Sequence, residues 1–406
     1  MENEKLKMEN YKQTELGLIP EDWEVKEVKK IAKIYDGTHS TPNYVDYGIP
    51  FYSVEHITSN NFKNTKFISE EVFFNENKRV KLERGDILMS RIGDIGTAKY
   101  IDWDVNASFY VTLALFKKIT EKIDFKFITF SINSSVFAKE LHKRTLHVAF
   151  PKKINLGDIG KCKIPLPPLP EQKKIADCLS TWDSAIEKQN ALINALTDRK
   201  KALMQQLLTG KKRLPGFSGE WKLNSINDLF IFKNGKAHEN DIDENGKYIL
   251  INSKFISTDG EILKKTNSNL APLEVNDLVF VMSDVPNGKA LAKFFLIKED
   301  NLYTLNQRIG LLKIKKGNPI FMYYLLNRNS YFLMFDNGVG QTNLRKDDIL
   351  DCPLNIPSLS EQTAIAEILA TADRELTLQK EKLAQLQTQK KGLMQVLLTG
   401  KKRLLN

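Results

Sequence analysis

The sequence predicts an α/β protein, of the α+β type, in which two similar domains are separated by two long helices. An internal repeat is the first observation: residues 171–214 and 361–404 align without a gap at an offset of 190, and 22 of the 44 positions are identical. The second is the pattern before each repeat, where short runs rich in Ile, Phe, Val and Tyr alternate with Gly, Asn and Asp, as strands and turns do.

Each repeat predicts one long helix of a coiled coil. Apolar side chains recur at alternating steps of four and three residues, which is the 3.5-residue period of a coiled-coil seam. Gly210 and Gly400 fit the position that ends a helix. Two matching helices in one chain favour pairing with each other, but dimerisation of the chain or packing against a sheet would require the same period. The predicted seam consists of Ile175, Leu179, Trp182, Ile186, Gln189, Ile193, Leu196, Lys200, Leu203 and Leu207, and of Ile365, Leu369, Ala372, Leu376, Gln379, Leu383, Leu386, Lys390, Leu393 and Leu397.

The segments before the two repeats correspond more loosely. Gly37 and Gly235 match at an offset of 198, and Asn106 and Asn306 each precede an apolar run. We expect strands through most of these segments, with one helix near the end of each. The predicted helices cover 125–141 and 319–334, and the predicted divisions are a first domain over 1–165, a first helix within 166–214, a second domain over 215–355 and a second helix within 356–406.

Composition excludes several classes of protein. The formal net charge is +10, but the two repeat segments carry seven of these ten excess charges, and residues 215–357 are neutral overall. Charge alone therefore leaves a nucleic-acid partner undecided. Three distant cysteines and five scattered histidines predict no disulfide framework, no metal site and no cofactor. With no signal segment and no apolar run of membrane length, we expect a cytoplasmic protein without a membrane partner.

No motif of a stand-alone enzyme occurs. The sequence has neither the NPP[YF] loop of amino-methyltransferases nor a phosphate-binding G-x-x-x-x-G-K-[ST] loop. The stretch PEDWEVK at residues 20–26 has the residue types of a PD…ExK nuclease, but a single residue separates its carboxylates Asp22 and Glu24. Such a site needs a longer spacer to hold a metal between adjacent strands, so we interpret this stretch as a strand.

The whole arrangement resembles the specificity subunit of a type I restriction–modification system. The residues that carry the resemblance are a Pro-rich run, then Glu-Gln, a long helix and LLTGKKRL, present twice, from 165 to 214 and from 356 to 404. The resemblance implies two target-recognition domains, each reading one half of an asymmetric, bipartite site in double-stranded DNA. It also implies antiparallel pairing of the helices as a spacer, docking of two methyltransferase (modification) subunits, addition of restriction subunits, and no catalysis by this chain. The alternative is a non-enzymatic scaffold whose coiled coil joins two duplicated protein- or ligand-binding domains.

Candidate DNA contacts follow from the chemistry of base edges and phosphates. Asn and Gln suit adenine, Arg and Lys suit guanine or phosphate, and hydroxyl groups suit several acceptors. Loops rich in these residues recur in both domains; the alternative for any one residue is a solvated turn that contacts nothing. The candidates in the first domain are Thr38, His39, Ser40, Thr41, Asn43, Tyr44, Arg91, Lys143, Arg144, Lys152 and Lys153. Those in the second are Lys233, Lys236, Asn287, Lys289, Asn306, Gln307, Arg308, Gln341, Thr342, Asn343 and Arg345.

Overall fold

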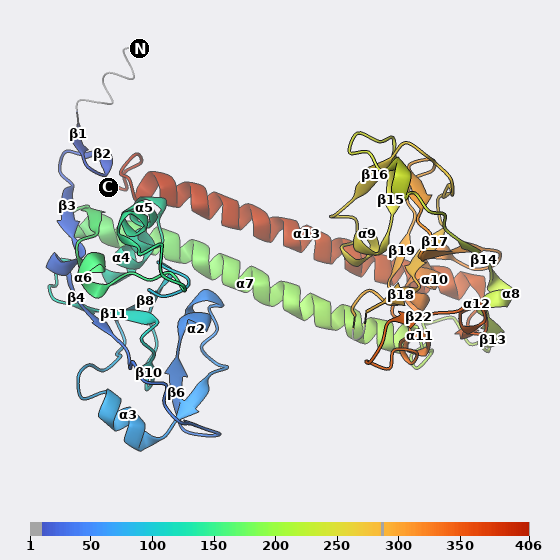
Figure 1. Cartoon of the computed structure of the whole chain (residues 1–406), viewed down its shortest axis with the longest axis horizontal. Coiled ribbons are helices and arrows are strands. Elements are labelled where there is room, and N and C mark those ends of the chain that lie inside the picture. The colour runs from blue at the N-terminus through green and yellow to red at the C-terminus, as the bar shows by residue number, and fades with distance from the viewer. Residues whose placement is uncertain (1–9, 286–287, 406) are drawn as a thin grey trace, which may run out of the picture. The chain divides into compact units, whose positions relative to one another are not determined.

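The computed structural model describes residues 10–285 and 288–405, and the chain divides into two compact units (Figure 1). Unit 1 consists of Met1–Asn190 and Lys382–Asn406, and unit 2 of Ala191–Glu381. Each unit contains one α/β domain together with part of both long helices, α7 (Leu169–Leu207) and α13 (Leu359–Leu397). The predicted class, two similar α/β domains and two long helices, is confirmed.

Unit 1 is built on an antiparallel sheet with the strand order β4-β11-β8-β9. Its strand β8 is buried on both faces: Ile87 and Met89 face the core that includes the long helices, whereas Leu88 faces a second core shared with the smaller sheet β10-β6-β7-β5. The elements before the long helix are β1 (Tyr11–Thr14), β2 (Gly17–Pro20), β3 (Glu24–Glu27), β4 (Ala32–Asp36), β5 (Tyr44–Val45), β6 (Ile49–Tyr52), α2 (Val54–Thr58), β7 (Lys66–Ile68), α3 (Glu70–Glu76), β8 (Ile87–Ser90), β9 (Ala98–Tyr100), β10 (Ser108–Phe109), β11 (Leu113–Lys118), α4 (Phe125–Ile132), α5 (Ser135–Arg144), α6 (Leu156–Gly160) and β12 (Lys163–Leu166).

Unit 2 repeats this plan with the strand order β14-β21-β17-β19. Leu278 and Phe280 of β17 face the core with the long helices, and Val279 and Val281 face the second core. The elements are β13 (Lys222–Ser225), α8 (Ile226–Leu229), β14 (Phe230–Asn234), β15 (Tyr248–Ile251), α9 (Ser253–Ser257), β16 (Lys264–Thr266), β17 (Leu278–Val281), β18 (Ser283–Asp284), β19 (Phe294–Leu296), β20 (Tyr303–Leu305), β21 (Ile309–Ile314), α10 (Pro319–Leu326), α11 (Ser330–Leu333), β22 (Thr342–Asn343), α12 (Lys346–Leu350) and β23 (Pro353–Ile356).

The two long helices run antiparallel. In unit 1 the start of α7, with Ile175, packs in one core with the end of α13, with Leu397; Figure 1 shows these two helix ends in green and red. In unit 2 the end of α7, with Leu207, packs with the start of α13, with Ile365. Every predicted seam position is buried or half-buried, whereas most of the positions between them are exposed. Gly210 and Gly400 both have φ +69°, a left-handed conformation that favours glycine after a helix.

Two lysines interrupt the apolar seam at equivalent positions, and each is paired across it. Lys390 of α13 bonds to Asp183 of α7 within unit 1. Its counterpart Lys200 of α7 bonds to Asp373 of α13 within unit 2. Each ammonium reaches a carboxylate on the facing helix, so the two lysines add polar contacts across the seam, and such contacts favour one register of pairing.

The helix predicted before each repeat is in fact two helices. In unit 1 the break lies between α4 and α5, where Asn133 donates to the carbonyl of Ala98 on β9 and Ser134 caps α5. In unit 2 the break lies between α10 and α11, where Asn327 accepts a hydrogen bond from Phe294 on β19. Each break therefore results from a side chain that bonds to a neighbouring strand, a contact that periodicity does not encode.

Candidate nucleic-acid interface

One edge of the main sheet in unit 1 brings together the ends of two strands. Because β11 is antiparallel to both β4 and β8, the ends of β4 and β8 lie beside the start of β11. The register pairs Asp36 with Ala114, and Ser90 with Leu113. The loops that follow β4 and β8 therefore leave the sheet at the same edge.

A third segment, residues 145–153, completes this edge. The N–H of Gly93 donates to the carbonyl of Lys152 at 2.8 Å, and the N–H of Ile154 donates to the carbonyl of Arg91 at 3.0 Å. Candidates from three separate stretches of sequence thus come together in space. We call this region edge 1; it consists of residues 36–44, 90–97, 110–112 and 145–153.

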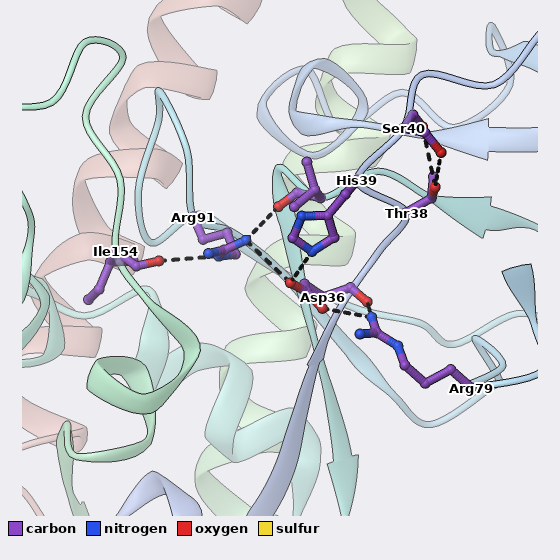
Figure 2. Close-up of polar contacts among 8 residues, drawn as sticks. Asp36, Thr38, His39, Ser40, Arg79, Arg91 and Ile154 are labelled. Atoms are coloured by element: carbon purple, nitrogen blue, oxygen red, sulfur yellow. Dashed lines mark hydrogen bonds and ion pairs between the residues drawn. The ribbon is translucent and has the colours of Figure 1, made fainter.

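Arg91 is a structural member of edge 1, with only 7% of its surface exposed. Figure 2 shows its guanidinium between the loops: Nε donates to the carbonyl of Ile154 at 3.2 Å and Nη1 to the carbonyl of Val111 at 2.9 Å. The same Nη1 lies 3.8 Å from the carboxylate of Asp36. These bonds hold the loops together and account for most of the burial of Arg91, so its role within edge 1 is structural; a contact of Arg91 with DNA stays a prediction.

Lys143 and Arg144 lie in the last turn of α5, where both pair with the buried Glu140. The carboxylate of Glu140 lies 3.0 Å from Lys143 Nζ and 2.9 Å from Arg144 Nη1. Burial opposes ionisation of Glu140, but the hydrogen bond from Lys143 and the charge of Arg144 lower its pKa. Both predicted cations are therefore paired within the protein, but the Lys143 side chain is still 61% exposed, and Lys152 and Lys153 are exposed as well.

The loop after β4 divides into a buried start and an exposed remainder. Thr38 is buried, and its N–H donates to the carbonyl of Phe109 at 3.1 Å. The side chain of His39 is 71% exposed, although its Nε2 lies 2.8 Å from the carboxylate of Asp36. The remaining candidates in this loop are all exposed: Ser40, Thr41, Asn43 and Tyr44.

Unit 2 repeats the edge with the same register. Asn234 pairs with Gly310, and Val281 pairs with Ile309. The N–H of Leu344 donates to the carbonyl of Met282 at 2.9 Å, as Ile154 does to Arg91 in unit 1. We call this region edge 2; its described part consists of residues 234–238, 281–285, 288–291, 306–308 and 338–345.

Most candidates of the second domain are exposed on or beside edge 2. Asn306 is half-buried, and its Oδ1 accepts the N–H of Gln307 at 2.6 Å. Thr342 is buried, and Asn287 lies outside the described residues. The exposed candidates are Lys233 within β14, Lys236, Lys289, Gln307, Arg308, Gln341, Asn343 and Arg345.

The bridges between loops correct one correspondence drawn from the sequence. Thr38 and Lys236 form equivalent parallel bridges with Tyr110 and Asn306. Tyr110, rather than Asn106, is therefore the counterpart of Asn306 in edge 1. The two domains have diverged too far for a single matching Asn to fix the alignment, so sequence reasoning missed Tyr110.

Sequence reasoning also missed exposed apolar side chains at both edges. Val148 and Phe150 are fully exposed beside Lys152 in edge 1, and Val339 is 86% exposed on the equivalent loop of edge 2. Apolar groups in such positions suit contact with thymine methyl groups or base faces. An apolar residue shortly before a pair of lysines in a predicted loop is the sequence pattern that could have identified Phe150.

The described residues lack the groups for metal binding and membrane spanning. Within residues 10–285 and 288–405, no group of three or more His, Cys, Asp or Glu side chains is placed to hold a metal ion. In the same part of the chain, no helix has the length and apolar character needed to cross a membrane. The cysteines are unpaired, and burial raises the pKa of Cys162 and of Cys352 to about 12, which keeps both thiols protonated.

A duplicated α/β domain that presents polar loops at one edge of each copy defines a recognition protein with two binding heads. The chain belongs to the family whose model is described as the type I restriction modification DNA specificity domain, which matches residues 20–198 and 218–388. It is 28% identical to the type I restriction enzyme MjaVIII specificity subunit of Methanocaldococcus jannaschii, over 98% of this chain and 97% of that protein. It is also 28% identical to the Escherichia coli EcoBI specificity subunit, over 57% of this chain and 49% of that protein. Among solved structures, the S subunit of a type I restriction-modification system from M. genitalium has the same fold, with a TM-score of 0.59 at 15% identity, over 92% of this chain and 96% of that one.

Proposed function

We propose that this chain is the DNA-reading subunit of a type I restriction–modification complex and recognises a two-part, asymmetric site in double-stranded DNA. In this proposal residues 1–165 and 215–355 are the reading domains, and residues 166–214 and 356–406 are the helical segments. One half-site meets edge 1 and the other meets edge 2. The chain supplies recognition alone, while methyltransferase and restriction subunits carry out the chemistry.

One observation supports this proposal above the others: the two edges share a backbone and differ in side chains, whereas the helical repeats retain half of their residues. Asp36 and Arg91 of edge 1 correspond to Asn234 and Met282 of edge 2. A reader of two different half-sites requires this divergence, because bases are distinguished by the donors and acceptors that meet them. A scaffold with two equivalent binding domains does not require it, and membership of the DNA specificity family does not favour the scaffold.

Methylome sequencing tests the proposal directly. In cells that produce the methyltransferase subunit, we expect methylation of one bipartite, asymmetric motif when this chain is present and none when it is absent. The purified complex should bind a duplex that carries the motif, with an affinity that falls steeply as salt rises because phosphate contacts release counterions. Equal methylation with and without the chain would contradict the proposal.

The outer surfaces of the helical repeats provide two equivalent docking sites for methyltransferase subunits. Four exposed side chains recur on each unit at the offset of 190, although the domains beside them have diverged. They are Lys201, Gln205, Lys211 and Lys212 in unit 2, and Lys391, Gln395, Lys401 and Lys402 in unit 1. Equal surfaces bind equal partners, so two methyltransferase subunits dock on one chain.

We expect two methyltransferase subunits per chain in the saturated complex, measured by native mass spectrometry. The double change Lys201→Glu and Lys212→Glu should remove one of them, because it reverses two charges on one docking surface and leaves the other intact. Lys188→Glu is the matched control: Lys188 is exposed on the same helix, but its repeat counterpart is Leu378. A saturated wild-type complex with a single methyltransferase would refute this arrangement.

A further inference from the structure

Arg79 was not among the predicted DNA contacts, yet it lies next to edge 1. It follows α3, and its side chain is 55% exposed. Together with Asp36, Thr38, His39 and Ser108 it lines a cavity of about 270 Å³. This cavity opens beside the loops that our proposed function assigns to the first half-site.

A buried carboxylate holds Arg79 in place. Asp36 is 8% exposed, and its Oδ1 accepts a hydrogen bond from Arg79 Nη2 at 2.6 Å. The same Nη2 donates to the backbone carbonyl of Asp36. Figure 2 shows Asp36 between Arg79, His39 and Arg91, so this one side chain links the end of β4 to two arginines that are distant from it in sequence. Burial raises the pKa of Asp36, but the hydrogen bonds from Arg79 and His39 outweigh burial and lower it, so the carboxylate remains ionised.

The guanidinium of Arg79 retains donors for a ligand. Arginine has five N–H groups, and the two hydrogen bonds to Asp36 use Nη2 only. Within the described part of the chain, no hydrogen-bond acceptor contacts Nε or Nη1 of Arg79. A guanidinium fixed on one side and free on the other is oriented before it binds, which reduces the entropy lost on binding.

The fold itself does not require this arrangement, because unit 2 forms the same edge without it. The register places Asn234 at the position of Asp36, and the bond from Leu344 places Met282 at the position of Arg91. The backbone N–H of Glu83 donates to the carboxylate of Asp86, and that of Glu274 donates to the carboxylate of Asp277, so the turns before β8 and β17 match at an offset of 191. This offset places Leu270 at the position of Arg79. The counterparts of all three charged residues are thus uncharged in unit 2. The cluster is a feature of one reading head and not of the fold.

We propose that Arg79, positioned by Asp36, reads a purine in the major groove of the first half-site. Guanine is the base that fits best, because its major-groove edge presents acceptors only, N7 and O6, whereas that of adenine also carries a donor; arginine is the commonest partner of guanine there. This inference rests on the proposed function, since it assigns one base position within a site that edge 1 is proposed to read.

The test compares Arg79→Ala with Arg84→Ala in the complex of this chain with methyltransferase. Arg84 is the matched control: it is 63% exposed, but it precedes β8 and so lies at the opposite edge of the same sheet. Binding is measured on duplexes in which each base pair of the methylated motif is replaced in turn. We expect Arg79→Ala to reduce discrimination roughly 10- to 100-fold at a single guanine of the first half-site. Discrimination at the second half-site should be unchanged. Arg84→Ala should leave every position unchanged.

Two further variants separate base reading from other roles. Arg79→Lys retains the charge but not the planar donor group, so discrimination should fall while the salt dependence of binding is retained. Asp36→Asn places in unit 1 the residue that unit 2 has at this position, and it should reduce discrimination at the same base as Arg79→Ala does. Equal weakening on all sequences, with a shallower salt dependence, would overturn the inference in favour of a phosphate contact, and an unchanged motif would also overturn it. A wild-type complex with no motif would instead count against the proposed function.

Discussion

Exchange of residues 20–160 for those of another family member should change one half of the methylated motif and leave the other half as it is. Each unit has its own two cores around its own sheet, so the side chains of edge 2 keep their supports when the first domain is replaced. The exchanged segment must retain Asp22 and Trp23, because both contact residues that lie outside it. Methylome sequencing of the hybrid gives the result.

The reciprocal hybrid is the control for this exchange. Replacement of residues 220–350 should change only the other half of the motif, and it leaves edge 1 untouched. A hybrid in which both halves change together would show that the two edges do not read independently, and it would refute the assignment of one half-site to each domain.

Replacement of Arg403 by Met should lower the free energy of unfolding by about 3 kcal/mol, because it leaves a buried carboxylate without its cation. Glu171 at the start of α7 has only 3% of its side chain exposed, and Arg403 donates to both of its oxygens, at 2.7 and 2.8 Å. Trp23 Nε1 donates to the same carboxylate at 3.1 Å and cannot replace the lost charge. The hydrogen bond to Glu171 raises the pKa of Arg403, as expected for a stabilised ion pair. Denaturant-induced unfolding measures the loss.

Two comparisons make this prediction specific. Arg213 forms the equivalent pair with Glu361 in unit 2, so Arg213→Met should cost a similar amount. Arg199 pairs with Glu375 on the helix surface, where its side chain is 57% exposed, and Arg199→Met should change stability by less than about 1 kcal/mol. A loss for Arg403→Met as small as that for Arg199→Met would show that Glu171 is effectively solvated.

Much of the fold could be predicted because its patterns are local or repeated. A 3.5-residue period specifies a coiled-coil helix within a few heptads, and a glycine after the last seam residue marks where each helix ends. The offset of 190 gave both helices at once, and strand-like runs gave the α/β class. The predictions of single helices over 125–141 and 319–334 were less accurate. Each of these segments is interrupted where an Asn side chain, Asn133 or Asn327, hydrogen-bonds to a neighbouring strand.

The candidate loops were predictable as a set, while the role of each side chain was not. The sequence by itself determined the two heads, the two helices and the polar loops after β4, β8, β14 and β17, because propensity and periodicity act over a few neighbouring residues. Only the tertiary structure decided that Arg91 is buried while Arg79 is exposed. Both arginines meet Asp36 across more than 40 residues of chain, through strands whose register brings their ends to one edge. Whether a charged side chain faces solvent or a buried partner depends on which strands are neighbours, and that information is absent from the local sequence around either arginine.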